Sequence, residues 1–335
     1  MGLTIIAAIF IFGILIFVHE AGHFMAAKAV GIRVNKFAIG MGPVIFKKQK
    51  GETEYSLRAF PMGGFVKMEG EDEDSDDARS FEKKSTFQKV LVLIAGSAMN
   101  FIFAIILVIF LFAYTGFPSN ENVIGEIVPG NPAEQAGIMA GDRVLEINSV
   151  EITSWDAVLE NVSESDGRPL TFKIDRDGEV FNIEVESISE QGRQVVGIIP
   201  SRERSLLKSV KEGVGATFEL MGMMLQFLGS ILRGQASTND VMGPVGIISA
   251  VGDVAKLGFI YLVNFTAMIS LNLAVINMIP FPALDGGRLI LTIIQGITGK
   301  KINPDMEGII HFIGFAILIG VMILVTYKDI GRLFQ

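Results

Sequence analysis

The stretch LTIIAAIFIFGILIFVHEAGHF, residues 3–24, decides how this chain must be built. Residues 3–18 carry no charged side chain and are apolar enough for a helix that crosses a membrane. His19 and His23 follow, four residues apart, with Glu20 directly after the first. Residues four apart lie on one face of a helix, so both imidazoles can reach one metal ion. The stretch therefore predicts a metal site inside a membrane helix.

The composition of the whole chain agrees with a membrane protein. Of its 335 residues, 50% are hydrophobic and 19% are charged, and the mean hydropathy is +0.48. A soluble domain of this length is usually less apolar. The net charge of −8 argues against nucleic acid as a partner. Because the chain has no cysteine, disulfides and thiolate metal ligands are excluded.

Four apolar segments are long enough to cross a bilayer, which takes about 20 residues of helix. We therefore expect a polytopic α-helical membrane protein with four transmembrane helices, at residues 1–31, 88–115, 257–280 and 308–327. The parts between them are a loop region at 32–87, a soluble module at 119–202, an amphipathic juxtamembrane region at 203–256 and a loop at 281–307. A fifth candidate, 213–232, contains Glu219 and Gln226 between charged flanks, which is typical of an amphipathic helix lying on the membrane.

Glu20 is placed to act together with the two histidines. Beside a zinc ion, a glutamate next to a ligand can take a proton from the attacking water as general base. Ionisable groups inside a membrane span cost several kcal/mol unless they are paired or bind metal, so a functional role is a better interpretation than chance burial. His19 follows Leu3 by about 24 Å of helix. This depth puts the site toward the far face of the membrane, within reach of water.

A catalytic zinc ion needs a third protein ligand and one open position. Asp285 follows the helix-breaking Pro280 and Pro282 in NMIPFPALDGGR. Broken backbone at membrane depth is tolerated where it is buried in protein or lines a wet cavity, although LDGG can also be read as a plain turn. His311, near the start of the fourth span, is the other candidate. Asp285 is therefore the preferred third ligand, and His311 stays an alternative.

The order of the spans fits the choice of Asp285. The basic residues of the 32–87 loop indicate the cytoplasmic side, so the end of the first span that carries His19 lies near that side. With four spans, Asp285 returns to the same side and the 119–202 module lies outside the cytoplasm. A fifth span at 213–232 would move Asp285 to the opposite face, where the site could not close.

The 32–87 loop contains two contrasting segments. Residues 47–65 alternate in short strand-like pieces around QKGET and predict a β-hairpin or small sheet. No long soluble sheet is predicted nearby, so the segment Lys47–Phe65 is expected to keep an unpaired edge that another chain can join, and prolines at Glu54–Ala59 would test it. The acidic run EGEDEDSDD, Glu69–Asp77, is interpreted as a solvated loop without chemistry.

Several motifs together resemble the site-2 protease family of intramembrane zinc metalloproteases. They are HEAGH in the first span, the GMG of Gly40 and Gly42, AGSAMNF in the second span, GPVGI before the third and LNLAVINMIPFPALDGG at its end. The resemblance covers essentially the whole chain. It implies one Zn²⁺ per chain, bound by His19, His23 and Asp285, with Glu20 as the general base.

The same resemblance implies a path for the substrate. Asn272 and Asn277 in the third span match asparagines associated with substrate handling, and hydrogen bonding between helices is the alternative role for them. The strand segment resembles a membrane re-entrant β-loop on the cytoplasmic side that pairs with an unwound substrate. The residues expected to bind substrate there are Tyr55, Ser56 and Leu57, with Gly40 and Gly42.

The 119–202 module resembles a PDZ domain, an α+β fold, in GEIVPGNPAEQAGIMAGDRVLEINSVEI. Its expected peptide-binding residues are Val196, Gly197 and Ile198. The inserted module resembles the branch of bacterial regulator of sigma E proteases. Some members carry two such modules in tandem, but this chain has room for one. A size-exclusion filter built from a pair of modules is therefore not expected.

These observations predict a multi-pass protease of the bacterial cytoplasmic membrane, with its active site near the cytoplasmic side and an extracytoplasmic PDZ domain. The expected partners are the lipid bilayer and single-span membrane proteins already trimmed outside, such as anti-sigma factors or remnant signal peptides; no nucleic acid is expected. The alternative is a non-enzymatic membrane binder or chaperone that uses the PDZ domain and holds an idle metal site. The intact Glu20 and the full ligand set count against that alternative.

Overall fold

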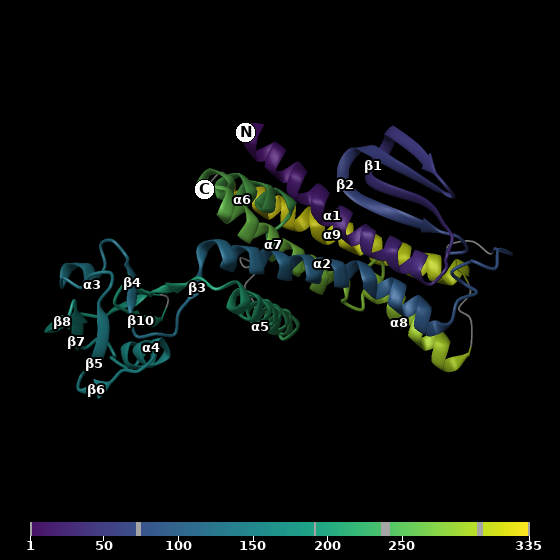
Figure 1. The fold of residues 1–335 in the computed structure, drawn as a ribbon. Helices are drawn as coiled ribbons and strands as arrows, with labels where there is room; N and C mark the ends of the chain where they lie inside the picture. Colours follow the sequence, from purple (N-terminus) through teal and green to yellow (C-terminus); the bar gives the residue numbers. More distant parts are fainter. Residues whose placement is uncertain (1, 72–74, 191, 236–241, 300–303, 334–335) are drawn as a thin grey trace. The chain divides into compact units, whose positions relative to one another are not determined.

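The computed structural model describes residues 2–71, 75–190, 192–235, 242–299 and 304–333. They form two compact units: Met1–Leu111 together with Gly213–Gln335, and Phe112–Glu212. The first unit is mostly helical and carries a β-hairpin, whereas the second is rich in strands (Figure 1). The module expected at 119–202 lies within the second unit.

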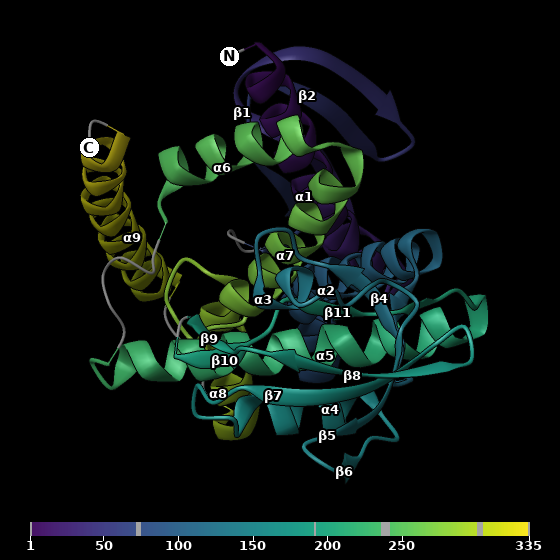
Figure 2. The ribbon, with the colours of Figure 1, turned by 90° about the vertical axis from the view of Figure 1, so that its left-hand side faces the viewer.

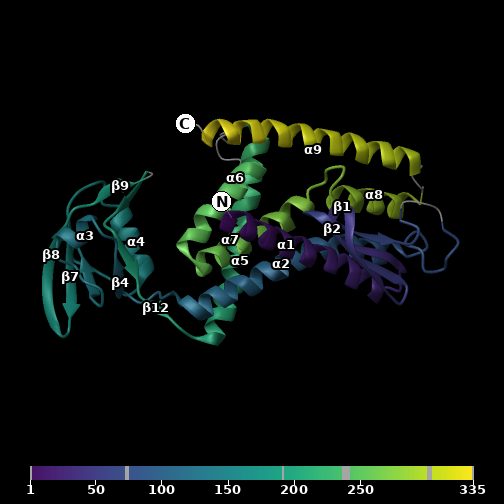
Figure 3. The same cartoon turned by 90° about the horizontal axis from the view of Figure 1, so that it is seen from above.

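Long apolar helices make up most of the first unit. They are α1 (Gly2–Ala29), α2 (Thr86–Thr115), α5 (Leu206–Leu232), α6 (Pro244–Leu257), α7 (Phe259–Asn277), α8 (Asp285–Thr298) and α9 (Pro304–Leu333). α1, α2 and α7 lie side by side (Figures 1 and 3). Ser270 Oγ on α7 donates a hydrogen bond of 2.8 Å to the carbonyl oxygen of Asn100 on α2. Gly258, at φ +120°, separates α6 from α7 in a backbone region that favours glycine.

Five helices of the described chain are long and apolar enough to cross a membrane, which fits a polytopic membrane protein. They are Thr4–Ala29, Thr86–Thr115, Leu206–Ile231, Phe259–Asn277 and Met306–Gly331. The candidate in α5 covers the segment for which the sequence predicts a helix on the membrane surface. From Gly213 on, α5 belongs to the first unit, where Phe218 contacts Phe101 of α2 edge to face at 5.2 Å. Figure 1 looks nearly along α5 and Figure 2 shows its full length, so it runs across the direction of α1 and α2.

The β-hairpin of the first unit consists of β1 (Val34–Lys50) and β2 (Thr53–Met68), and it curls back on itself (Figure 1). Because of this curl, four segments pair side by side in the order 44–50, 53–58, 36–39 and 64–68. The outer segments 44–50 and 64–68 are therefore the two edges of this small sheet.

The curl corrects one expectation about the hairpin. Tyr55 pairs with Lys48 on one side and with Phe37 on the other, and Ser56 and Leu57 likewise have strand partners on both sides. The expectation of an unpaired edge is therefore wrong for these three residues. The hairpin supplies both partners from its own chain, which a pattern of alternating residues does not reveal.

One hydrophobic core fixes the hairpin to the helices that surround it. Its buried side chains are Val34, Phe37 and Met68 of the hairpin, Ala27 of α1, Val92 of α2 and Leu289 of α8. This core therefore holds the end of α1, the hairpin and α8 together as one body.

The acidic run forms a loop, but its carboxylates do not simply face water. Asp72, Glu73 and Asp74 lie outside the described residues. Glu69 accepts hydrogen bonds from Ser75 Oγ (2.6 Å) and Asn35 Nδ2 (2.7 Å), which hold the pKa of its carboxyl below its usual range. The run is a loop as expected, but it is not fully solvated where the structure describes it, because local composition does not show which hydroxyl or amide groups fold back onto an acidic stretch.

A buried carboxylate connects α9 to α6. Asp329, 3% exposed, accepts hydrogen bonds from the backbone N–H of Gly243 (3.2 Å) and of Gly246 (2.8 Å). Free N–H groups and the positive end of the helix dipole make the start of a helix a favourable place for a carboxylate.

The second unit is a small α+β domain. Its antiparallel sheet has the order β6-β5-β7-β8, formed by β5 (Arg143–Ile147), β6 (Val150–Glu151), β7 (Leu170–Arg176) and β8 (Glu179–Val185). The remaining elements are β3 (Phe117–Pro118) paired with β12 (Arg202–Glu203), β4 (Ile124–Ile127) with β11 (Ile198–Pro200), β9 (Ile188–Glu190) with β10 (Arg193–Val195), and the helices α3 (Pro132–Gln135) and α4 (Trp155–Ser163). Ile147, Phe172 and Trp155 lie in its core. Buried Asp142 accepts two hydrogen bonds of 2.7 Å from Arg176 of β7.

Candidate metal centre

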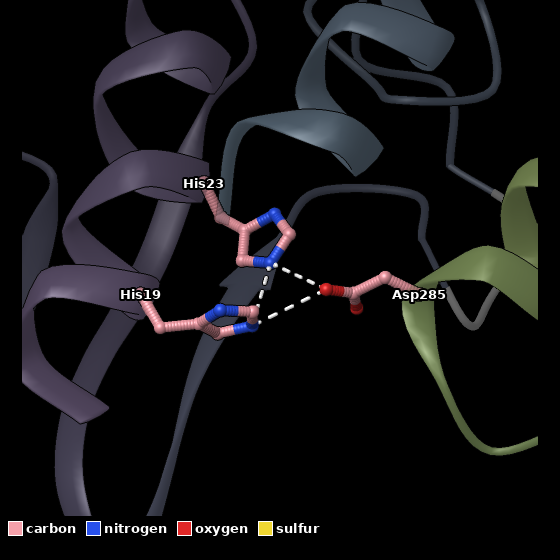
Figure 4. Close-up of side chains that lie close together, drawn as sticks. All are labelled: His19, His23 and Asp285. Atoms are coloured by element: carbon pink, nitrogen blue, oxygen red, sulfur yellow. Dashed lines mark hydrogen bonds and ion pairs between the residues drawn. The ribbon is translucent and has the colours of Figure 1, made fainter. Parts of the chain in front are cut away.

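Three side-chain atoms from α1 and α8 converge on one point (Figure 4). His19 Nε2 and His23 Nε2 are 3.3 Å apart. Asp285 Oδ2 lies 3.2 Å from the first of these nitrogens and 3.3 Å from the second. The three residues form a group that can hold one metal ion.

The triangle of ligand atoms fits zinc. Tetrahedral Zn²⁺ with bonds of about 2.0–2.1 Å places its ligands about 3.3 Å apart, which matches the three edges of the triangle. Asp285 Oδ2 is buried and has no hydrogen-bond partner among the described residues, although it faces both imidazoles. This is expected when three lone pairs point at a shared cation and not at one another. Two histidines and a carboxylate leave the fourth position open, as at a catalytic zinc site.

The site depends on a close approach of α1 and α2. A Cβ atom at Gly22 would overlap the carbonyl group of Ala95. A Cβ atom at Gly96 would overlap His23 Nε2 and lie 2.8 Å from His19 Cε1. Small residues that let two backbones approach are a common means of packing membrane helices. Here they also leave room for the two imidazoles.

α2 orients both histidine rings. His23 Nδ1 donates to the carbonyl oxygen of Val92 at 2.9 Å, which leaves its Nε2 unprotonated and facing Asp285. His19 Nδ1 lies 3.4 Å from Nδ2 of the Asn100 amide, which is fully buried. With the amide turned so that its otherwise unpartnered Oδ1 faces the ring, that oxygen accepts the Nδ1–H of His19. Such outer contacts fix the tautomer of a metal-binding histidine.

Asp285 reaches the histidines because the chain is broken between α7 and α8. α7 ends at Asn277, and Pro280 and Pro282, which lack the N–H that a helix needs, prevent its continuation. Gly286 and Gly287 in the first turn of α8 press against carbonyl groups of the preceding loop, where a Cβ atom would overlap them. The break thus turns the chain tightly and points the first residue of α8 into the site.

An ion pair anchors the first turn of α8. Arg288 Nη1 donates to Glu71 Oε1 at 2.5 Å, and the side chain of Glu71 is 8% exposed. Glu71 Oε2 accepts a hydrogen bond of 3.2 Å from the backbone N–H of Met68 at the end of β2. Since Arg288 follows Asp285 by one turn, the pair connects the hairpin to the helix that carries the third ligand.

His311 is not in the ligand group. It lies on α9, and its Nδ1 accepts a hydrogen bond of 3.0 Å from the backbone N–H of Ala283. The structure therefore brings Asp285, and not His311, to the two histidines of α1.

Glu20 lies against the hairpin. A Cβ atom at Gly64 would be 2.9 Å from Glu20 Cγ and 2.9 Å from the carbonyl oxygen of Ala38. Segment 64–68, one of the two edges of the curled sheet, therefore begins directly beside the Glu20 side chain. The expected general base and one strand edge of the sheet are neighbours.

The other expected binding residues lie on α7, in the hairpin and in the second unit. On α7, Asn272 is exposed and Asn277 is half-buried. Gly40 and Gly42 have positive φ and lie where β1 curls, between segments 36–39 and 44–50. A Cβ atom at either glycine would meet Phe60. In the second unit, Val196 is 2% exposed and belongs to the core, Gly197 has a positive φ, and Ile198 pairs with Ile127 of β4.

Two imidazoles and a carboxylate with a glutamate beside them, in a chain with several membrane-type helices, define a metal-dependent hydrolase of the membrane. Comparison with known families narrows this class of hydrolase to one family: residues 7–321 match Peptidase family M50. The chain belongs to this family and is an intramembrane zinc metalloprotease of the site-2 protease type.

Individual relatives agree with this assignment. A protein of Clostridium perfringens is 42% identical over 330 residues, covering 97% of this chain and 98% of the relative. The zinc metalloprotease RasP of Geobacillus kaustophilus is 31% identical over 414 aligned positions, covering 99% and 98% of the two chains. The regulator of sigma-W protease RasP of Bacillus subtilis is 31% identical over 417 positions, covering 99% of each. A non-enzymatic binder with an idle metal site is not favoured by these relatives.

The geometry predicts which residue completes the zinc site. Asp285→Ala removes one of the three converging ligand atoms, so the purified protein should lose its zinc. His311→Ala leaves the triangle intact and should retain about one zinc per chain. Metal content measured by atomic emission on both variants checks this. Retention by Asp285→Ala together with loss by His311→Ala would reverse the assignment.

Proposed function

We propose that this protease cleaves peptide bonds within the membrane-spanning segments of single-span proteins, with one zinc ion held by His19, His23 and Asp285 and with Glu20 as general base. The observation that carries the proposal is the triangle of ligand atoms, with edges of 3.2, 3.3 and 3.3 Å. It is set on α1, a helix of membrane-spanning length and composition.

Zinc held by His19, His23 and Asp285 would supply a positive charge that polarises the scissile carbonyl and activates a water molecule for attack. Glu20 would accept a proton from the attacking water and deliver it to the amide nitrogen as the peptide bond breaks. Val92 and Asn100 hold the rings of His23 and His19 with Nε2 toward the site.

A helical substrate must unwind before its peptide bond can be reached, because the helix hides its amide groups in internal hydrogen bonds. Segment 64–68 can hold the unwound chain by adding it as a further strand. Its place beside Glu20 supports this role. We therefore assign substrate pairing to segment 64–68 and not to Tyr55, Ser56 and Leu57, whose main chain is already paired on both sides. Main-chain pairing depends little on side chains and suits a broad range of substrates.

The proposed topology has four spans, formed by α1, α2, α7 and α9, with the hairpin and active site near the cytoplasmic side. α5 lies along the membrane surface, which is supported by its course across α2 in Figures 1 and 2. Its exposed apolar side chains, such as Phe218, Met223 and Leu225, are suited to contact lipid. The strand-rich unit is then extracytoplasmic.

The strand-rich unit is proposed to be a single PDZ domain that binds a peptide along β11. In the described residues β11 pairs with β4 alone, so its other edge can accept a strand next to Val196, Gly197 and Ile198. The alignments with the two RasP proteins extend over 414 and 417 positions, against 335 residues here. Those relatives therefore contain segments that this chain lacks.

The proposed location is a bacterial cytoplasmic membrane, since the relatives described above are bacterial proteins. One of them is named as a regulator of sigma-W. That name supports anti-sigma factors as a substrate class, and remnant signal peptides offer the same single-span chemistry. Asn272 and Asn277 on α7 are proposed to contact such substrates.

The role of Glu20 is testable by an isosteric change. Glu20→Gln cannot accept the proton of the attacking water, so cleavage of a single-span substrate should fall at least ~10²-fold, while zinc content stays near one per chain. Glu219→Gln on α5 is the matched control and should cleave normally. Near-wild-type turnover by Glu20→Gln in detergent would exclude the mechanism.

The topology can be tested with single cysteines, because the chain has none of its own. In intact cells, an impermeant maleimide should label Ser163→Cys in the strand-rich unit. It should not label Ser75→Cys in the hairpin-side loop until the cells are opened. Equal labelling of both before opening would contradict an extracytoplasmic PDZ domain and four spans.

The substrate strand can be located by a proline scan. Proline removes a ladder donor without adding charge, so at least one position among Phe65, Val66 and Lys67 should cripple cleavage while zinc content and folding persist. The control scan covers Ile45, Phe46 and Lys47 on the far edge, where stable variants should cleave normally. If both scans are flat, or if only the far edge matters, segment 64–68 does not hold the substrate.

A further inference from the structure

His311 contacts the loop that delivers the third zinc ligand. It lies on α9, 28 residues beyond Ala283, and its Nδ1 accepts the backbone N–H of Ala283 at 3.0 Å. Because Nδ1 is the acceptor, the ring proton is on Nε2, which faces Glu307 Oε1 at 3.9 Å. The side chain thus uses its inner nitrogen for the loop.

The loop needs such a partner. Phe281 and Leu284 donate their N–H groups to nearby carbonyl oxygens, and Pro280 and Pro282 have no N–H to place. Ala283 has φ +77°, a left-handed conformation that side chains other than glycine rarely adopt. A conformation of this kind persists where its surroundings hold it, and irregular backbone at membrane depth requires a protein partner for each polar group.

A second contact on the same face of α9 reinforces the first. Gly314 follows His311 by three residues, and a Cβ atom there would lie 2.5 Å from the carbonyl oxygen of Pro282. α9 therefore fits closely against two consecutive residues, Pro282 and Ala283. Asp285, whose Oδ2 completes the ligand triangle, comes two residues later.

We propose that His311 is a positioning residue: by binding the Ala283 N–H it holds the strained loop in the shape that places Asp285 against His19 and His23. This inference rests on the proposed zinc site, and His311 itself neither binds the metal nor touches substrate. Through His311, the last span of the protein contributes to the geometry of the site.

Asparagine and glutamine substitutions at His311 test whether its role is to accept the Ala283 N–H. The Oδ1 of an asparagine can occupy the place of histidine Nδ1 and accept the Ala283 N–H, whereas a glutamine reaches instead toward the place of Nε2. His311→Asn should therefore restore the contact, His311→Gln should not, and His311→Leu removes it. Phe315→Leu, an exposed position on the same helix, is the matched control.

The test uses the full chain and two kinds of measurement. In zinc-free protein, hydrogen exchange of the peptide over residues 280–287 should be about 10-fold faster in His311→Leu and His311→Gln, since the Ala283 amide loses its acceptor. With zinc, kcat should fall about 10-fold in these two variants, while KM changes less than about 2-fold and zinc content stays near one per chain. His311→Asn and Phe315→Leu should behave as the wild type in every measurement.

Wild-type exchange and kcat in His311→Leu, or an asparagine variant as impaired as the leucine variant, would overturn the inference. Loss of zinc from both His311→Leu and His311→Asn would also overturn the inference, because His311 would then be a zinc ligand. If no protein, the wild type included, cleaves a single-span substrate, the proposed function fails. The exchange pattern of the zinc-free proteins still decides the role of His311 in that case.

Discussion

The metal centre depends on the close approach of α1 and α2, which two glycines permit. Gly22 lets the backbone of α1 meet that of α2 at Ala95, and Gly96 leaves space for the imidazole of His23. Lipid tails are as apolar as leucine, so membrane helices gain little by hiding apolar side chains and pack instead through small residues and polar contacts. The same approach brings the Val92 carbonyl and the Asn100 amide to the outer nitrogens of the two histidines.

The third ligand comes from a different constraint, the broken chain between α7 and α8. A broken helix frees backbone polar groups, and inside a membrane such groups need partners from the protein or from a wet cavity. Here the break is held by the packing of Gly286 and Gly287, by the Arg288–Glu71 pair and by the His311 contact. These contacts come from the loop itself, the hairpin side and α9. As a consequence, β2, which carries the strand edge beside Glu20, is connected to α8, which carries Asp285, through the Arg288–Glu71 pair.

Much of this site is visible in the sequence because its signals are local. The HEAGH spacing follows from helix geometry, and ionisable residues in an apolar run indicate function wherever the helix packs. Asp285 could be preferred over His311 because the two prolines and the order of spans can be read without coordinates. Apolar length likewise predicted the long helices α1, α2, α7 and α9, whereas α8 lies in a segment that was expected to be a loop.

The features that escaped prediction depend on contacts between distant segments. The hairpin was expected, but its curl, which pairs Tyr55 on both sides, depends on register and not on composition. The ion pair of Glu71 in the acidic run cannot be read from the sequence, because its partner, Arg288, is 217 residues away. Asn100 lies in the AGSAMNF motif, and an amide inside an apolar span needs a partner, but the sequence does not show that this partner is His19.

The most direct test of the account is the zinc affinity of Gly96→Ala. The added methyl group occupies the space of the His23 ring, so the account predicts at least about a 10-fold loss of zinc affinity in competition with a chelator. Gly215→Ala on α5, where a Cβ atom meets nothing within 4 Å, should bind zinc as the wild type does. Wild-type affinity in a folded Gly96→Ala protein would contradict the claim that the helix approach at this glycine builds the site.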